Sequence, residues 1–517
     1  MEIQTLFTKK NLRRAFVAAG LVLLFVLYTN GITRNPPGFY MDESATAYNA
    51  YLISRTGAGE FGRHFPLMIQ WYSGPSVSYV NSVTIYLLAI VFRFLPPSIL
   101  AARAFAAFWM FSACLLLGLL AKRISGRTSI GVIVGGTALL TPWFFEESRL
   151  VWDAHFVPIA VMLFVLAAYH AQKKDKWTWR EIATLAGSLA ILTYGYFAGR
   201  VLAPLFALGL LFFATTRARL FGIAKVWIAY GLTLVPTLIF GWMHPGAVAN
   251  RWELATYMKS GVPWRDSLTE FIRRYLEDQS VIGLLQTGHP LPRHHVVEAG
   301  GVFFFAIFAI SMMGLLRIIL VRRQNPWWRF ALYGLAISIV PGAITYEPFH
   351  ALRLLALPVF LLLITVPALE WFLATDEEKH SPPLSSKGRR TFAQPLRLSV
   401  LGVLLLITAA EAIHFQTLFR RYGPNRGVFF DEPYKAAFDA AVAQPKRPIY
   451  LIDGFYGPTY IDGLWYATVE GKPRSDFVHL VGDAKPPPGG VVITSGQDCQ
   501  NCEIMRRSGI YLVYRAR

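Results

Sequence analysis

Long apolar segments recur along the chain from residue 15 to residue 415. A helix of about 20 apolar residues is long enough to cross the ~30 Å hydrocarbon core of a bilayer. Only 16% of the residues are charged, and the mean hydropathy is +0.41, whereas soluble proteins carry about 25% charge. A single anchor on a soluble enzyme does not explain so many apolar segments. The sequence therefore predicts an α-helical polytopic membrane protein.

About eleven segments are long enough to cross, and one further segment is ambiguous. The eleven are residues 15–33, 99–121, 128–144, 154–171, 181–197, 199–216, 221–242, 300–320, 329–345, 351–373 and 397–415. The ambiguous segment, 77–95, is apolar on average but carries Asn81, Ser82, Thr84 and Arg93. We predict that it lies along the membrane interface as an amphipathic helix.

The basic residues decide this topology. They cluster between the apolar segments, in KKNLRR (9–14), KRISGR (122–127), KKDKWTWR (173–180), RARLFGIAK (217–225), RRQNPWWR (322–329) and DEEKHSPPLSSKGRR (376–390). If 77–95 does not cross, all six clusters lie on the cytoplasmic side, as the positive-inside rule requires. The net charge of +19 is then a topology signal, so we expect no nucleic-acid partner. The basic start followed by an apolar run predicts an uncleaved first span and a cytoplasmic N-terminus.

This topology predicts a transmembrane domain, 1–415, and a small extracytoplasmic domain, 416–517. Two large outer loops, 34–98 and 243–298, interrupt the transmembrane domain. In the extracytoplasmic domain, β-like runs at 447–453, 490–495 and 509–515 and a helix around 433–443 predict an α/β fold. Cys499 and Cys502 form a single C-x-x-C there, which indicates a local disulfide more than a redox centre.

Asp42 and Glu43 are candidate catalytic residues, because they form an adjacent carboxylate pair just after the first span on the outer side. The alternative is a solvated helix N-terminus, where acidic residues complement the helix dipole. The short outer turns favour catalysis, since each carries an arginine beside a tyrosine, histidine or carboxylate. These residues are Glu146, Arg149 and Asp153; Tyr194, Tyr196 and Arg200; and His350 and Arg353.

These arginines could line a polar cavity that faces outward, although each turn alone could hold a structural ion pair or an interfacial anchor. Guanidinium groups at the lipid boundary suit a lipid phosphate, because arginine binds phosphate oxygens bidentately. Other motifs are weaker. GAGEFG (57–62) has no preceding strand, which argues against a dinucleotide site. His289, His294, His295 and Glu298 leave a divalent metal possible in the second large loop.

The pattern resembles the GT-C superfamily of membrane glycosyltransferases, in particular the bacterial branch similar to protein O-mannosyltransferases and the lipid A aminoarabinose transferase. The resemblance covers roughly residues 10–415. Its most specific element is the pair Asp42 and Glu43, followed by AYNAYLISRTG and by HFPLMIQWYSGP. Arg103, at the start of a span, the turn that ends at Asp153, YGYFAGRVLAP and HALR also resemble positions in that family.

The resemblance implies an inverting transfer from a polyprenyl-phosphate-linked sugar on the outer face of a bacterial inner membrane. Asp42 would be the general base, and Glu43 would orient the acceptor hydroxyl. Arg149, Arg200 and Arg353 would bind the donor phosphate. Asp153, Tyr194, Tyr196 and His350 would shape the substrate pocket. The acceptor is a hydroxyl of a glycan, lipid or protein, and no cofactor is implied with certainty.

Two other functions fit the same residues. A transporter or flippase of a lipid-linked sugar would also gather arginines around a lipid phosphate. Against it, the chain shows no internal repeat, and its charges lie at the ends of the spans instead of the midplane. A non-catalytic protein that displays the C-terminal domain would leave the carboxylates and arginines without a common role.

Overall fold

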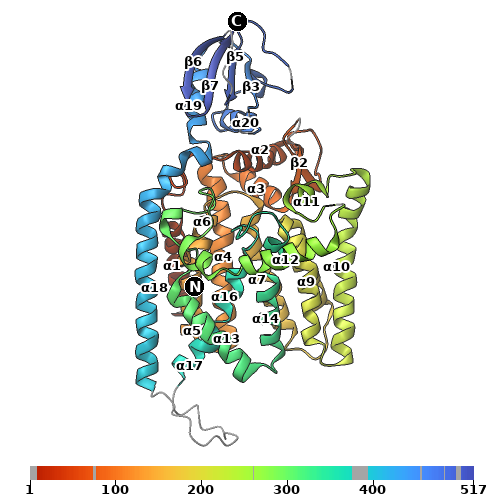
Figure 1. Ribbon diagram of the computed structural model, residues 1–517, viewed down its shortest axis with the longest axis vertical. Coiled ribbons are helices and arrows are strands. Elements are labelled where there is room, and N and C mark those ends of the chain that lie inside the picture. Colours follow the sequence, from red (N-terminus) through yellow and green to blue (C-terminus); the bar gives the residue numbers. More distant parts are fainter. Residues whose placement is uncertain are drawn as a thin grey trace, which may run out of the picture.

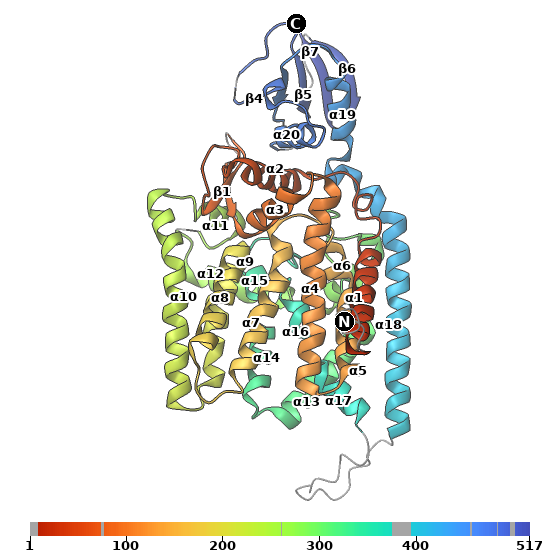
Figure 2. The ribbon, with the colours of Figure 1, turned by 180° about the vertical axis from the view of Figure 1, so that it is seen from behind.

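The protein is a bundle of helices that carries a small β-sheet domain at one end (Figures 1 and 2). The computed structural model describes residues 9–73, 77–259, 261–374, 394–454, 457–482, 484–496 and 502–517. We call the end of the bundle that carries the C-terminal domain the domain side.

Among the described residues, six helices are long and apolar enough to cross a membrane. They cover Asn11–Tyr28, Ile99–Ser125, Asp153–Ala171, Arg217–Met243, Phe305–Arg322 and Gln394–Phe430. Shorter apolar helices cover Val83–Phe94, Thr128–Leu140, Phe197–Phe213 and Leu357–Leu373. The chain is therefore a multi-pass membrane protein. The number of spans, about eleven from the sequence, stays a prediction.

Eighteen α-helices precede the C-terminal domain in the part of the chain that the structure describes. They are α1 (Lys9–Tyr28), α2 (Met41–Thr56), α3 (Val83–Phe94), α4 (Ile99–Ser125), α5 (Thr128–Leu140), α6 (Pro142–Glu147), α7 (Val157–Ala171), α8 (Trp179–Gly195), α9 (Phe197–Gly209), α10 (Arg217–Met243), α11 (Asn250–Ala255), α12 (Trp264–Glu277), α13 (Phe305–Arg317), α14 (Pro326–Ile337), α15 (Val340–Ala343), α16 (Leu357–Leu363), α17 (Val366–Leu373) and α18 (Gln394–Tyr422). Short 3₁₀ and π segments extend several of them.

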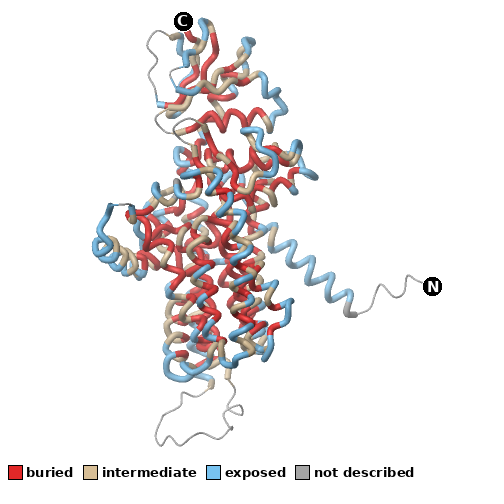
Figure 3. The backbone as a smooth tube through the Cα atoms, turned by 90° about the vertical axis from the view of Figure 1, so that its right-hand side faces the viewer, coloured by how far each residue is buried: buried red, intermediate tan, exposed pale blue. Residues whose placement is uncertain are grey.

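The centre of the bundle is formed by α4 and α7, whose apolar windows are 61% and 78% buried. Close approach of backbones holds α4 against α5. A Cβ atom at Gly118 would lie 2.6 Å from the carbonyl oxygen of Gly131, and one at Gly131 would lie 2.7 Å from that of Gly118. Small residues allow this packing in membranes, where no hydrophobic effect drives one helix against another. The apolar windows of α1, α10 and α18 are only 6%, 17% and 22% buried, as expected for lipid-facing surfaces, and the exposed α1 stands away from the bundle in Figure 3.

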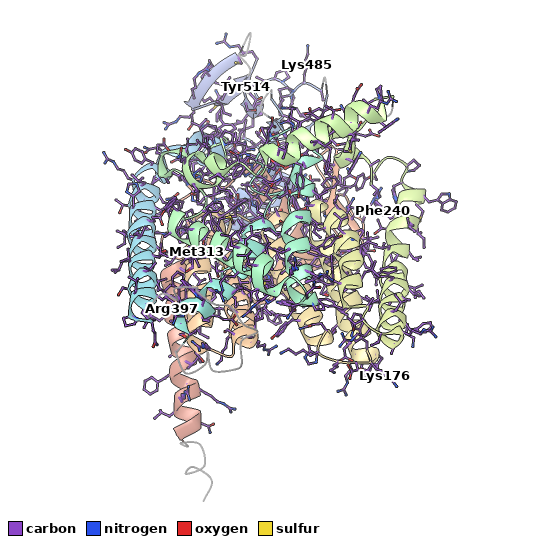
Figure 4. The ribbon with its side chains drawn as sticks, turned by 60° about the horizontal axis from the view of Figure 1, so that its bottom comes forward. Lys176, Phe240, Met313, Arg397, Lys485 and Tyr514 are labelled. Carbon is purple, nitrogen blue, oxygen red and sulfur yellow. The ribbon has the colours of Figure 1, made fainter. Side chains whose placement is uncertain are left out.

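The basic clusters at 122–127, 173–180, 217–225 and 322–329 lie at the end of the bundle opposite the domain side (Figures 1 and 2). Figure 4 labels Lys176 and Arg397 at that end, far from Tyr514 and Lys485 in the C-terminal domain. Contacts join these loops: the Tyr169 hydroxyl donates to the Arg123 carbonyl at 2.7 Å. The cluster at 376–390 lies outside the described residues.

The first large loop packs flat on the domain side of the bundle (Figure 2). It contains α2, α3 and an antiparallel hairpin of β1 (Met68–Trp71) and β2 (Ser78–Asn81). Because α3 has 12 residues, it is about 18 Å long and too short to cross a bilayer. This length agrees with the predicted interfacial helix, although the observed helix is shorter than 77–95.

The C-terminal domain is a five-stranded mixed sheet with two helices. The strands are β3 (Ile449–Ile452), β4 (Phe477–Leu480), β5 (Val491–Ser495), β6 (Cys502–Ser508) and β7 (Tyr511–Ala516), in the order β4-β3-β5-β7-β6. The helices are α19 (Glu432–Val442) and α20 (Tyr460–Val469). The predicted runs correspond to β3, β5, β7 and α19, whereas β4, β6 and α20 were not predicted. Helix α18 continues to Tyr422, past the predicted boundary at 415. Cys502 is disulfide-bonded, and Cys499 lies outside the described residues.

A buried ion pair attaches the first loop to the bundle. Both carboxylate oxygens of Glu43 accept from Arg103 of α4, from Nε at 3.0 Å and from Nη2 at 2.7 Å, and both side chains are fully buried. The Glu43 carboxylate also accepts from the backbone N–H groups of Tyr40 and Val151. The remaining Arg103 donors bind the carbonyl oxygens of Ile32, Pro36 and Gly38. Every strong polar atom of the pair therefore has a partner.

We predict that Glu43→Gln destabilises the protein strongly, because it leaves the Arg103 charge buried without a counter-ion. Breaking one side of such a pair costs about 3–5 kcal/mol. The melting temperature in detergent measures the effect. The control is Glu503→Gln, which breaks an exposed pair with Arg515 and should cost about 0–1 kcal/mol. Equal, small shifts for the two variants would contradict a structural role for the Glu43 pair.

Candidate active site

A pocket of about 210 Å³ opens on the domain side, and we call it the Asp42 pocket. Five segments that are distant in the sequence meet there: the start of α2, the end of β1, the turn before α7, the loop 288–296 and the turn before α16, with Tyr196 between α8 and α9 in addition. The lining residues are Asp42, Trp71, Trp152, Asp153, Tyr196, Leu291, Arg293, His294, Glu347, His350, Leu352 and Arg353.

Asp42 lies in the first turn of α2, which orients its carboxylate. The Tyr72 hydroxyl donates to Asp42 Oδ1 at 2.5 Å. The preceding N–H, that of Met41, donates to Oδ2 of Asp431 in the C-terminal domain at 3.0 Å. One residue further along α2, Glu43 points into the bundle instead. Asp42 is half-buried and lines the pocket.

Two guanidinium groups line the wall of the pocket. Arg353 Nη2 lies 3.1 Å from Oε2 of Glu347, and its Nη1 donates to the Thr345 hydroxyl at 2.9 Å. Arg293 lies over the ring of Tyr40, with 3.7 Å between the guanidinium carbon and the ring centroid. The Glu347 side chain is 58% exposed. An anion that entered the pocket could therefore replace this carboxylate beside Arg353.

The remaining wall is aromatic, with buried nitrogen atoms that have no hydrogen-bond partner. Trp71 Nε1 and His294 Nδ1 are two such atoms. The rings of Trp152 and His294 are 5.0 Å apart, and those of His294 and His350 are 5.1 Å apart. Aromatic surface with a few unpaired polar groups is typical of a site for a small polar ligand. A sugar, which has both ring faces and hydroxyl groups, fits this description.

The histidines of this wall are neutral in the folded protein. Burial lowers the pKa of His294 well below its ordinary value, and the nearby Arg293 and Arg353 lower it further. Burial also lowers the pKa of His350, with Arg353 as the next cause, and the pKa of His289 falls to about 4. Neutral imidazoles can accept or donate single hydrogen bonds without adding charge to the pocket.

The pocket brings together five of the residues that the sequence indicated: Asp42, Asp153, Tyr196, His350 and Arg353. The other five lie elsewhere: Glu146 pairs with His295, and the remaining four are held as follows. Glu43 is in the ion pair with Arg103, and the Tyr194 hydroxyl donates to the Thr233 carbonyl of α10 at 2.6 Å. Arg200 Nη2 donates to Asn81 Oδ1 at 2.7 Å, which holds the end of β2. Arg149 lines a separate cavity with α1 and α18.

Several lining residues were not among the sequence candidates. Trp71 and the nearby Tyr72 belong to HFPLMIQWYSGP, and Arg293 belongs to HPLPRHHVVE, where the sequence indicated His294 only as a possible metal ligand. Both motifs are visible in the sequence, but nothing in their spacing shows that β1 and the loop 288–296 approach α2. Among the described residues, no group of three or more His, Cys, Asp or Glu side chains is arranged to hold a metal ion.

Comparison with known proteins shows the fold. No protein-family model and no curated protein sequence matches the chain. Among solved structures, ArnT from Cupriavidus metallidurans, a lipid A aminoarabinose transferase, superposes in its apo state with a TM-score of 0.58 at 11% identity, over 96% of this chain and 98% of ArnT. The chain has the GT-C fold.

Two further structures with the GT-C fold are similar. ArnT from the same organism bound to undecaprenyl phosphate has a TM-score of 0.56 at 10% identity and covers 98% of both chains. The oligosaccharyltransferase of Archaeoglobus fulgidus, tethered to an acceptor peptide, has a TM-score of 0.52 at 14% identity. It covers 90% of this chain and 64% of the archaeal one. The predicted GT-C fold with its C-terminal sheet domain is thus confirmed.

We predict that acid destabilises the folded protein through the neutral histidines of the Asp42 pocket. Because the folded pKa of His294 lies below 6.5, the unfolded chain binds more protons below that pH, and stability falls as the pH falls. His294→Phe removes one such group. Its melting temperature should therefore fall less than that of the native chain between pH 7.5 and about 5. The control is His414→Phe, at an exposed histidine, which should melt like the native chain at each pH. If the melting temperature of His294→Phe also fell as much as that of the native chain, the neutral state of His294 would be contradicted.

Proposed function

We propose that the protein is an integral-membrane inverting glycosyltransferase. It moves a sugar from a polyprenyl-phosphate donor to a hydroxyl group of a glycan, lipid or protein acceptor. The reaction takes place in the Asp42 pocket. The observation that carries the proposal is the convergence there of the Asp42 carboxylate, two guanidinium groups and an aromatic wall with unpaired nitrogen atoms.

The reaction needs a base for the acceptor. In this account Asp42 accepts the proton of the acceptor hydroxyl while that oxygen attacks the anomeric carbon of the donor. The new glycosidic bond forms on one face as the bond to the phosphate breaks on the other, and the configuration inverts. The Tyr72 hydroxyl donates a hydrogen bond to Oδ1 of Asp42. This bond orients the carboxylate and leaves Oδ2 for the acceptor proton.

The leaving group needs positive charge. Arg353 and Arg293 are the candidates for the donor phosphate, because both line the pocket with Asp42. Negative charge grows on the phosphate as the bond breaks, so fixed guanidinium groups stabilise the transition state more than the ground state. The donor would displace Glu347, the present partner of Arg353. Arg149 and Arg200, which the sequence also suggested for the phosphate, take no part in this step.

The other residues position the reactants. Trp71, Trp152 and Tyr196 offer surfaces for the sugar ring, while Asp153 and His350 contribute polar groups beside it. Glu43 acts through α2: its pairing with Arg103 sets the direction in which Asp42 points. We assign it a positioning role in place of direct contact with the acceptor.

The similar structures support a lipid-linked donor. One of them is bound to undecaprenyl phosphate, and another is tethered to an acceptor peptide. We further propose that the domain side is extracytoplasmic in a bacterial inner membrane, with the N-terminus in the cytoplasm. The basic loops at the opposite end support this orientation.

We predict that Asp42→Asn abolishes transfer without preventing donor binding, because the amide cannot accept the proton. Loss of a general base costs about 10²–10⁴-fold in rate. Purified protein in lipid bilayers, given short-chain polyprenyl-phosphate sugars and candidate acceptors, is assayed for released polyprenyl phosphate. Binding of the donor is measured separately.

The matched control is Asp439→Asn, an exposed aspartate on α19, which should release polyprenyl phosphate at the native rate. Native turnover by Asp42→Asn would refute Asp42 as the base. Movement of the intact donor across sealed vesicles, without release of polyprenyl phosphate by the native chain, would replace the transferase with a transporter.

A further inference from the structure

A second cavity lies on the lipid-facing side of the bundle, and we call it the Arg149 cavity. Its volume is about 460 Å³, and it lies between α1, the α5–α6 corner and α18. It shares no lining residue with the Asp42 pocket. Its apolar wall consists of Leu24, Leu27, Leu139, Leu140, Phe145 and Phe419.

Positive charge gathers at one end of this cavity. Arg34, Arg149 and Arg420 line it, and no carboxylate does. Arg149 is 3% exposed and binds only carbonyl oxygens with its terminal nitrogens: those of Tyr28 at 2.9 Å, Asn30 at 3.1 Å and Asn35 at 3.4 Å. Glu146, whose charge acts on Arg149, already pairs with His295 and Arg426. Among the described residues, none forms a salt bridge with these three guanidinium groups, so together they suit an anion.

An unpaired donor marks the centre of the site. Arg149 Nε is buried and has no hydrogen-bond partner. Burial is also the largest cause that lowers the pKa of Arg149, to about 10, and the charge of Arg420 lowers it further. A buried cation with a free donor is costly unless an anion approaches it. A phosphate group would supply both the counter-charge and the acceptor.

The apolar wall continues beyond the cavity as a trough. Another cavity, of about 330 Å³, shares Leu24 and Leu139 with the Arg149 cavity. It follows α4 and α5, past Gly136, as far as Thr128. From Leu139 to Thr128 the trough is about 16 Å long, roughly half of the ~30 Å hydrocarbon core. Helix α1 forms its open side and leaves the bundle at an angle (Figure 3), with only 6% of its window buried. A single acyl chain fits this shape.

We propose that an anionic glycerophospholipid binds here, with its phosphate at Arg34, Arg149 and Arg420 and one acyl chain along the trough between α1 and α5. The head group belongs to the leaflet on the domain side. Such a lipid fills the space between α1 and the bundle and supplies a counter-ion that the described part of the chain does not. The site does not depend on the proposed transferase activity, since none of its residues line the Asp42 pocket.

The test is lipid binding to the full, delipidated chain in detergent, with phosphatidylglycerol as the probe and phosphatidylcholine as the zwitterionic comparison. Native mass spectrometry counts bound lipid, and the melting temperature reports its effect. The exposed pair Arg34→Gln/Arg420→Gln should weaken phosphatidylglycerol binding about tenfold or more, because each basic residue near a lipid surface contributes about 1 kcal/mol. The matched control, Arg14→Gln/Arg421→Gln, changes two exposed arginines of α1 and α18 outside the cavity and should bind like the native chain.

A second pair of variants tests the trough. Gly136 and Gly187 are helical glycines with no atom within 4 Å of an added Cβ, but only Gly136 lines the trough. Gly136→Leu should weaken binding, and Gly187→Leu should not. Equal losses in both arginine pairs, or equal binding of phosphatidylcholine, would overturn the site. Binding of polyprenyl phosphate with no binding of phosphatidylglycerol would overturn the assignment to a glycerophospholipid.

Discussion

The buried ion pair between Glu43 and Arg103 sets the geometry of the domain side. It attaches the start of α2 to the central helix α4 through two hydrogen bonds. Successive residues of a helix point about 100° apart, so a Glu43 side chain that faces the bundle turns Asp42 toward the pocket. A charged pair at this depth is a costly way to gain stability. It is well suited, however, to holding one side chain in one direction.

The C-terminal domain completes this arrangement. Asp431 accepts from the first N–H group of α2 and from the Tyr511 hydroxyl. Asp462 of α20 accepts from Ser44, also on α2, at 2.5 Å. The helix that carries Asp42 is therefore held from below by the bundle and from above by the sheet domain. This gives the domain a structural connection to the candidate site that its position in the sequence does not suggest.

The sequence could predict the features that depend on local pattern. Apolar length and the placement of basic residues gave a polytopic helical protein, and alternation gave β3, β5 and β7. Helix α20 was not predicted from the sequence because it is buried nearly all round, so YIDGLWYATV has no amphipathic pattern. Strand β4 has only four residues. The strands of the hairpin β1–β2 are equally short, with four residues each.

The candidate site shows where such patterns stop. Asp42 and Glu43 are adjacent and chemically alike, and only the position of Arg103 separates the accessible carboxylate from the buried one. Arg149 and Arg353 both occupy short turns on the same side, yet they line different cavities. In the turn before α7, Arg149 faces α1, whereas Asp153 faces α2 and lines the Asp42 pocket together with Arg353. Arg293 and Trp71 reach the pocket from long loops, whose paths depend on tertiary contacts.

The central claim is that the Asp42 pocket, and not the Arg149 cavity, receives the donor sugar. Photo-crosslinking with a short-chain polyprenyl-phosphate sugar that carries a diazirine on the sugar ring tests it most directly, because the labelled peptides are read by mass spectrometry. The account predicts labels in residues 291–294 and 347–353 and in the start of α2. Labels confined to the segment after α1, around Arg34, and to α18, around Arg420, would contradict it.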